Sequence, residues 1–151
     1  MNDLSYEPRR LIPALTPLYN RVVPLSWALV RFAVGWNLVI HAWFKILRGG
    51  PGATLGAFSS MGYEPAAFYA YSSFCIEGVA GIGIVLGLFT RFFSAAAAIE
   101  MLVIFCAYWS TGFPWLSRGY EYVLLWGLVC FAIALRGGGP YSLDRKLGRE
   151  L

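Results

Sequence analysis

Four long apolar stretches alternate with short polar connections along the chain. They lie at about residues 25–47, 66–89, 92–109 and 120–135. A helix needs about 20 apolar residues to cross a bilayer, and the first two stretches meet this length. The last stretch is short and would need flanking polar side chains to extend to the interface. The pattern predicts an all-α integral membrane four-helix bundle with short loops.

The segments outside these stretches divide the chain into three parts. Residues 1–24 combine prolines, which should break any long helix, with apolar residues that suit a membrane surface. We expect this segment to lie on the cytoplasmic face of the membrane. Residues 25–135 would form the four-helix domain, and residues 136–151 a polar cytoplasmic tail.

The low content of charge agrees with a membrane protein. Charged residues make up 13% of the chain and hydrophobic residues 58%, whereas soluble domains carry about 25% charged residues. The net charge of +4 does not indicate a nucleic-acid partner, because the basic residues flank apolar stretches. Most of them fall before the first stretch, between the second and third, or after the fourth, which predicts that both termini are cytoplasmic.

Seven polar residues lie inside the apolar stretches, where a charge is costly and usually faces a bundle interior. They are Arg31, Asn37, His41 and Lys45 in the first stretch, and Glu77, Glu100 and Glu121 in the later ones. At helical spacing, the first four share about a third of the helix circumference. Small residues flank Glu77 and Glu100 on their helical faces, so both carboxylates should lie in helix–helix contacts.

Estimated depths along the helices suggest two clusters. Arg31 is nearest in depth to Glu77 and Glu100, and we expect it to pair with one of them. Glu121 is nearest to His41 and Lys45. These residues could form a purely structural ion-pair network, a site for a polar or quinone-like ligand, or a proton path. A single buried histidine is more often a hydrogen-bonded core residue than a ligand.

We also expect a cavity that opens toward the outer leaflet, between the first and last helices. The histidine ring carries an N–H group, so His41 could donate a hydrogen bond to a quinone carbonyl. The aromatic residues Trp109, Phe113 and Trp115 could cover this space.

Intrinsic metal cofactors are not expected. The single histidine rules out bis-histidine haem, and no Glu-x-x-His pairs suit a di-iron bundle. No Cys/His cluster suits zinc. The chain therefore predicts no haem, iron–sulfur cluster or bound metal, which leaves a quinone as the possible cofactor.

Five motifs resemble those of the DoxX family. They are Arg31-x9-His41-x3-Lys45, MGYEP at 61–65, EGVAGIGIVLGLFTR at 77–91, GYEYVLL at 119–125 and YSLDRKL at 141–147. The resemblance implies a multi-pass protein of the bacterial inner membrane, from a family named after a subunit linked to thiosulfate:quinone oxidoreductase. Some members are membrane partners of redox enzymes.

The expected function is therefore that of an accessory membrane subunit of a quinone-linked redox system, not catalytic on its own. Its partners would be the lipid bilayer, a membrane or peripheral redox protein and, if it forms a homo-oligomer, further copies of the chain. Two alternatives remain open. The chain could be a stand-alone small-molecule or proton-conducting protein, or a structural anchor of a larger membrane complex.

Overall fold

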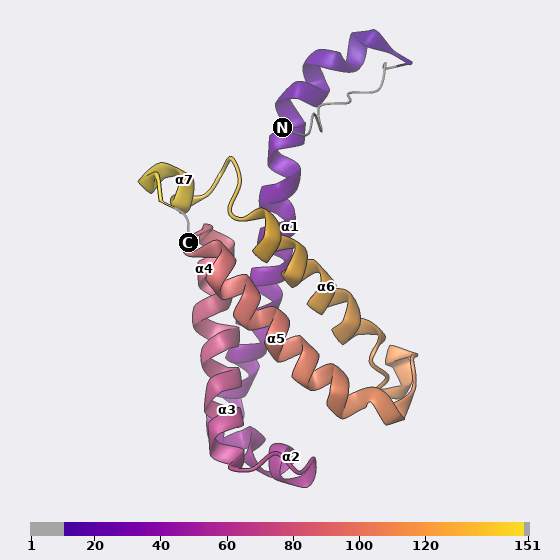
Figure 1. Ribbon diagram of the computed structural model, residues 1–151, viewed down its shortest axis with the longest axis vertical. Helices are drawn as coiled ribbons and strands as arrows, with labels where there is room; N and C mark the ends of the chain where they lie inside the picture. Colours follow the sequence, from indigo (N-terminus) through magenta and orange to yellow (C-terminus); the bar gives the residue numbers. More distant parts are fainter. Residues whose placement is uncertain (1–10, 150–151) are drawn as a thin grey trace.

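The computed structural model describes residues 11–149, and this part of the chain is helical without strands, which confirms the all-α class (Figure 1). Residues 1–10 of the predicted interfacial segment and 150–151 of the predicted tail lie outside the described range. The elements, in order, are η1 (Pro13–Leu15), α1 (Thr16–Leu47), η2 (Pro51–Thr54), α2 (Leu55–Ser60), α3 (Ala66–Cys75), η3 (Ile76–Ala80), α4 (Gly81–Leu86), α5 (Thr90–Tyr108), η4 (Trp109–Thr111), η5 (Trp115–Ser117), α6 (Glu121–Arg136) and α7 (Leu143–Leu147).

The first long helix begins nine residues earlier than expected, at Thr16 instead of residue 25. The expectation that prolines break this segment was wrong for Pro17 and Pro24. Pro17 lies in the first turn, where a backbone N–H has no intrahelical partner and its absence costs little. Pro24 lies inside α1, and membrane helices tolerate such interruptions. In Figure 1, the N-terminal part of α1 extends beyond the other helices.

The second apolar stretch forms one continuous helical rod, Ala66–Leu86, with an irregular centre. Its middle part, η3, is a π-helical turn between α3 and α4. Such turns are rare and often occur at functional sites. Glu77 lies in this turn.

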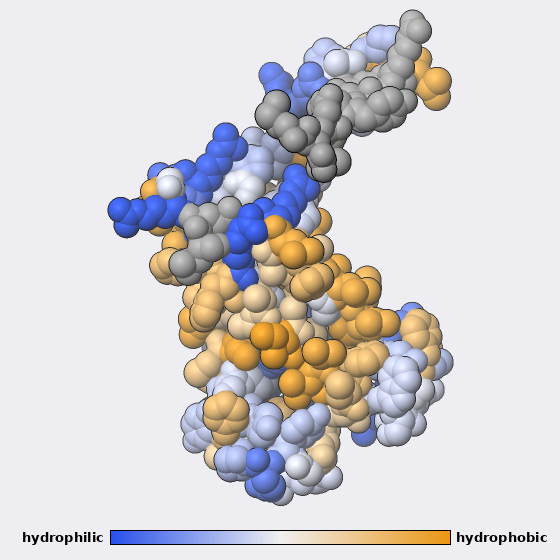
Figure 2. Space-filling view, viewed as in Figure 1, coloured by the Kyte–Doolittle hydropathy of each residue, from blue (hydrophilic) through white to orange (hydrophobic). Residues whose placement is uncertain are grey.

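The surface suits a lipid environment. Figure 2 shows strongly hydrophobic residues across the middle of the molecule and hydrophilic residues toward its ends. Three stretches are long and apolar enough to cross a bilayer: Pro13–Leu47, Ala66–Leu86 and Thr90–Thr111. The remaining long helix, α6, has 16 residues. Because exposed apolar area of this extent is unfavourable in water, the chain is a multi-pass membrane protein.

The helices pack around a small apolar core, in which α1 lies against α4 and α5 lies against α6 (Figure 1). Glycines allow the first of these contacts. A Cβ atom on Gly35 would lie 2.5 Å from the Gly81 carbonyl oxygen, and one on Gly81 would lie 2.9 Å from that of Gly35. Close backbone approach through small residues is typical of membrane helices. The buried core residues are Val34, Leu38, Ile84, Ala97, Met101, Cys130 and Ile133.

The segment after α6 folds back onto the bundle, and Asp144 fixes it there. The Asp144 carboxylate accepts hydrogen bonds from the backbone N–H groups of Phe89 (2.7 Å) and Thr90 (2.9 Å), and from the Thr90 hydroxyl (2.7 Å). The first N–H groups of a helix have no intrahelical partners and favour a nearby negative charge. Asp144 therefore caps the N-terminus of α5 from a distant part of the chain.

Arg31 holds the same segment from the side of α1. Its side chain is 1% exposed. The guanidinium group donates to the carbonyl oxygens of Ile84 (3.0 Å) and Val85 (3.3 Å) and to that of Tyr141. Carbonyls at a helix C-terminus lack intrahelical partners, so Arg31 satisfies the end of α4 and ties it to the C-terminal segment.

Trp27 adds a third contact on this side. Its indole N–H donates to the Gly137 carbonyl oxygen (2.9 Å), and the Arg136 guanidinium lies 4.4 Å from the centre of the Trp27 ring. We refer to Trp27, Arg31, Gly137, Tyr141 and Asp144 as the C-terminal clasp. The predicted polar tail is thus a packed part of the structure at least as far as Asp144.

The clasp gives a first prediction. Replacing Asp144 with Ala leaves buried backbone donors of α5 without an acceptor, at a cost of about 1–3 kcal/mol for each unsatisfied group. Asp144→Ala should therefore lower the thermal unfolding midpoint of the detergent-solubilised protein clearly. Lys146→Ala, an exposed change on the same short helix, is the control and should leave the midpoint unchanged. Equal midpoints for the two variants would contradict the capping role.

Candidate functional site

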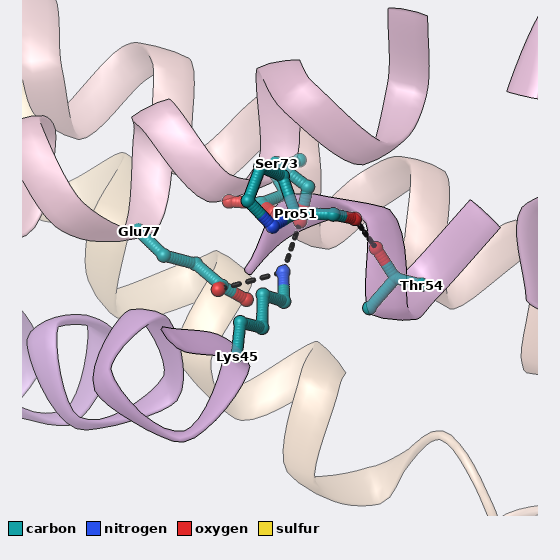
Figure 3. A network of polar contacts seen from close by, with 6 residues as sticks. Lys45, Pro51, Thr54, Ser73 and Glu77 are labelled. Atoms are coloured by element: carbon teal, nitrogen blue, oxygen red, sulfur yellow. Dashed lines mark hydrogen bonds and ion pairs between the residues drawn. The ribbon is translucent and has the colours of Figure 1, made fainter. Parts of the chain in front are cut away.

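Four polar side chains from three long helical segments meet inside the bundle, and Figure 3 shows three of them, Lys45, Ser73 and Glu77. Lys45 of α1 donates from Nζ to Ser73 Oγ of α3 (2.6 Å), and the same nitrogen lies 2.7 Å from Glu77 Oε2 of η3. The Ser73 hydroxyl in turn donates to Glu100 Oε1 of α5 (2.6 Å). We call Lys45, Ser73, Glu77 and Glu100 the Lys45 cluster.

The cluster is almost free of solvent contact. Glu77 is 5% exposed, Glu100 7% and Ser73 6%. Both carboxylates thus lie in helix–helix contacts, as the small residues around them indicated. Only Lys45 supplies a positive charge against two carboxylates, and Glu100 Oε2 is buried without a hydrogen-bond partner among residues 11–149. Burying an uncompensated charge is costly, so this imbalance requires an explanation.

The expected pairing of Arg31 with Glu77 or Glu100 was wrong, and Lys45 takes this role. Arg31 binds backbone carbonyls of α4 and the C-terminal segment, with Asp144 as the acidic group that attracts it. Depth along a helix does not reveal backbone acceptors such as those that bind Arg31. It also leaves out side-chain length, and the long lysine side chain extends from the end of α1 to Glu77.

A cavity of about 400 Å³ lies beside the cluster, between α1, α5 and α6. Asn37 and His41 line it from α1, and Glu77 contributes from η3. We call it the His41 cavity. Its other lining residues are Leu38, Met101, Ile104, Tyr108, Trp115, Arg118, Gly119, Tyr122, Val123, Trp126 and Cys130. Most walls are therefore apolar or aromatic, with a few polar groups, which is typical of small-molecule sites.

The position of this cavity agrees with the expectation of a space between the first and last long helices, next to His41. His41 is exposed and lines the cavity, so it is not a buried core histidine. Of the three aromatic residues expected to cover it, Trp115 lines the cavity. Trp109 and Phe113 instead pack against Tyr120, at ring-centre distances of 5.2 Å and 5.8 Å.

A second, smaller cavity of about 210 Å³ lies on the other side of the cluster, under α2 and the loop that follows it. Lys45, Ser73 and Glu77 line it, together with residues such as Phe58 and Tyr63. We call it the α2 cavity. Glu77 lines both cavities, as do Ile104 and Tyr108, so these three residues lie between the two spaces.

Glu121 does not join either group. Its Oε2 accepts a hydrogen bond from the Trp115 backbone N–H (3.3 Å), and its own backbone N–H donates to the Phe113 carbonyl oxygen (3.0 Å). Glu121 therefore fixes the loop before α6 and thereby positions Trp115 at the His41 cavity. Glu121 therefore bonds to its own loop, and not to His41 or Lys45 as its depth suggested.

Three residues of the site did not stand out in the sequence. Ser73 is one of the small residues on the helical face of Glu77, yet it links Lys45 to Glu100. Asp144 lies in the YSLDRKL motif but carried no assigned role. Trp126 lines the His41 cavity, and its Nε1 is buried without a hydrogen-bond partner in the described range. Helical spacing from Glu77 would have identified Ser73, whereas the other two depend on tertiary packing.

Metal ligands do not gather at the site. Within residues 11–149, no three His, Cys, Asp or Glu side chains lie close enough together to hold an ion. The polar groups that line the His41 cavity include the donors Asn37, His41 and Trp126 on apolar walls, which suit an organic ligand with polar acceptors.

The cluster gives a second prediction, on stability. Lys45→Met leaves buried acidic groups without their cation, and losing one partner of a buried pair costs about 3–5 kcal/mol. We expect a large drop in the thermal unfolding midpoint, and partial recovery in the Lys45→Met/Glu77→Gln double variant. Arg48→Met, which removes an exposed cation one turn further on, is the control. No recovery in the double variant would mean that Lys45 and Glu77 are not coupled.

Comparison with known proteins identifies the family. A DoxX family model matches residues 26–109, and a model described as TQO small subunit DoxD matches residues 68–151. Each match covers more than half of the 151 residues. No curated protein and no solved structure shows significant similarity. On the strength of the two family matches, the chain belongs to the DoxX family of membrane proteins.

Proposed function

We propose that this protein is an accessory membrane subunit of a quinone-linked redox system, and that a quinone head group binds in the His41 cavity. The cavity itself carries the proposal, because it combines apolar walls with few hydrogen-bond donors at one site. The DoxD match supports the redox context, since TQO denotes thiosulfate:quinone oxidoreductase.

The donors of the cavity fit a quinone. A quinone ring is apolar and flat, with carbonyl oxygens that accept hydrogen bonds. Asn37 and His41 lie one helical turn apart on α1 and both face the cavity. The buried Trp126 indole N–H has no hydrogen-bond partner among residues 11–149 and would gain one from a ligand oxygen. The volume of about 400 Å³ lies within the usual range for small-molecule sites.

A larger redox protein is the proposed partner. The name of the matching model, a small subunit, implies a larger subunit that carries out the oxidation. In this arrangement the chain described here would hold the quinone at membrane depth, while the partner would deliver electrons to it. The stand-alone transporter and the structural anchor remain alternatives, and the experiments below separate them.

The proposed orientation places the C-terminal clasp in the cytoplasm of a bacterium, at the inner membrane. The fourth crossing would be made by α6, whose 16 residues are short for a bilayer and would be completed by flanking residues. The exposed basic residues Arg136, Arg145, Lys146 and Arg149 lie on the clasp side, and this bias favours the cytoplasm. The loop that carries Trp115 and Arg118 would face outward.

Quinone binding gives a third prediction. A short-chain quinone should quench tryptophan fluorescence of the purified protein saturably, because Trp115 and Trp126 line the cavity. His41→Leu should weaken the apparent affinity about 2- to 10-fold, as expected for the loss of one hydrogen bond. Trp126→Phe should remove much of the quenching.

Trp43→Phe is the control for this titration, because Trp43 is 56% exposed and does not line the cavity. Non-saturable quenching that all variants share would show partitioning into detergent and would contradict the binding site.

Purification from native membranes in mild detergent tests the partner. A quinone-reducing enzyme should co-purify in stoichiometric amount, and a chain that is always recovered alone would favour the stand-alone alternative.

The orientation gives a fourth prediction. In a background without native cysteines, a cysteine at Ser117 should react with an impermeant thiol reagent added outside intact cells. A cysteine at Lys146 should react only after the cells are opened. Both positions are exposed in the structure, whereas Ser142, another clasp-side position, is buried and unsuitable. Labelling of both positions from the same side would refute the proposed topology.

A further inference from the structure

The Lys45 cluster contains one more acidic group than its cation can balance. Two carboxylates, Glu77 and Glu100, share the single ammonium group of Lys45. If both carboxylates were ionised, the cluster would bury a net negative charge between helices in a membrane. Buried groups of this kind normally neutralise themselves, because an unpaired charge in an apolar interior costs many kcal/mol.

The hydrogen bonds indicate which carboxyl group carries the extra proton. Glu77 Oε2 lies 2.7 Å from the Lys45 ammonium group and is therefore the partner of the cation. Among the residues that the structure describes, Glu100 has no such contact with a cation. Its Oε1 accepts a hydrogen bond from the Ser73 hydroxyl, which itself accepts from Lys45. The remaining oxygen, Glu100 Oε2, is buried without a partner among the described residues.

The groups that surround Glu100 offer no second cation. It faces Lys45 from α1, Ser73 from α3, Glu77 from η3 and the Cys130 thiol from α6. Of the charged groups within residues 11–149, Lys45 and Glu77 are those that act on it. The first attracts and the second repels a negative charge on Glu100, and Lys45 is already paired with Glu77.

We propose that the Lys45 cluster is a proton-binding site that holds one exchangeable proton on Glu100. In the resting state, Lys45 is a cation, Glu77 is a carboxylate and Glu100 is a neutral carboxylic acid. A metal ion would not fill this place, because hard cations need several oxygen ligands and the ammonium group of Lys45 already lies between the available oxygens.

The position of the cluster gives the proton a route to water. Ser73, which is hydrogen-bonded to Glu100, lines the α2 cavity together with Lys45 and Glu77. Glu77 also lines the His41 cavity. A proton on Glu100 can thus exchange with water in one cavity and lies next to a carboxylate that faces the other. The proton site could exchange a proton with a ligand that gains or loses one. The proton on Glu100 does not depend on quinone binding.

Infrared spectroscopy of the purified protein at neutral pH tests the proposal. A neutral carboxylic acid has a C=O stretching band that is separate from those of carboxylates and the amide backbone. The wild-type protein should show one such band, and it should shift when the buffer is exchanged for D₂O. The band should be absent in Glu100→Gln and present in Glu64→Gln, which changes an exposed carboxylate outside the cluster. A wild-type spectrum without this band, or with one that ignores D₂O, would refute the proton site.

Two further variants test the charge balance and the assignment to Glu100. Glu77→Gln should abolish the band, because Lys45 then balances Glu100 and no proton is needed. Ser73→Ala removes the hydrogen bond to Glu100 Oε1 and should therefore shift the band to higher frequency. If the proton were on Glu77, which does not bond to Ser73, the band would stay in place. That result, or a band that persists in Glu77→Gln, would overturn the assignment.

Discussion

The cost of burying charge away from water governs how this chain packs. α1 carries two cations that cannot be left unpaired between helices, Arg31 and Lys45, about 21 Å apart along the helix axis. Arg31 is satisfied by the carbonyls at the end of α4 and by the C-terminal segment. Lys45 is satisfied by Ser73 and Glu77. Each cation thus fixes α1 to the second helical rod at a different depth.

The contacts between these two points are apolar and tight. Gly35 and Gly81 bring the backbones of α1 and α4 together, and Val34 and Leu38 fill the core on either side. Arg31, Lys45 and the Gly35–Gly81 contact all lie on the side of α1 that faces α3 and α4. The second helical rod therefore covers this side of α1. α6 packs along α5 and makes few contacts with α1. His41 is consequently exposed and Asn37 partly buried, and the His41 cavity is the space that this arrangement leaves.

Much of this fold follows from the pattern of apolar residues, and the parts that do not follow have identifiable reasons. The bounds of α5 and α6 lie within two residues of the predicted stretches, since polar turns delimit them sharply. The start of α1 was misplaced because proline was treated as a helix breaker, although Pro17 lies in a first turn. Pro24 lies inside α1, where a membrane helix tolerates the interruption.

The candidate site, like the fold, could be predicted from the sequence only in part. Burial of Glu77 and Glu100 was predictable, because small residues surround them at helical spacing. Their partners were not predictable from depth alone. Arg31 uses backbone carbonyls, which every residue has and no sequence pattern marks. Asp144 caps a helix that begins 54 residues earlier in the chain, and this relation exists only once the C-terminal segment has folded back.

The π-helical turn at η3 connects the structural and the functional parts of the molecule. A wider turn changes the angular phase between the residues before and after it. On one side of this turn, Ser73 faces Lys45 and Glu100; on the other, Gly81 packs against Gly35. Glu77 lies within the turn itself, paired with Lys45 and in contact with both cavities. In a regular helix, the direction of Ser73 would fix the direction of Gly81. The polar cluster and the tight glycine contact could then form together only if regular helical spacing suited both. The irregular turn relaxes this requirement, and it does so at the carboxylate that lies between the two cavities.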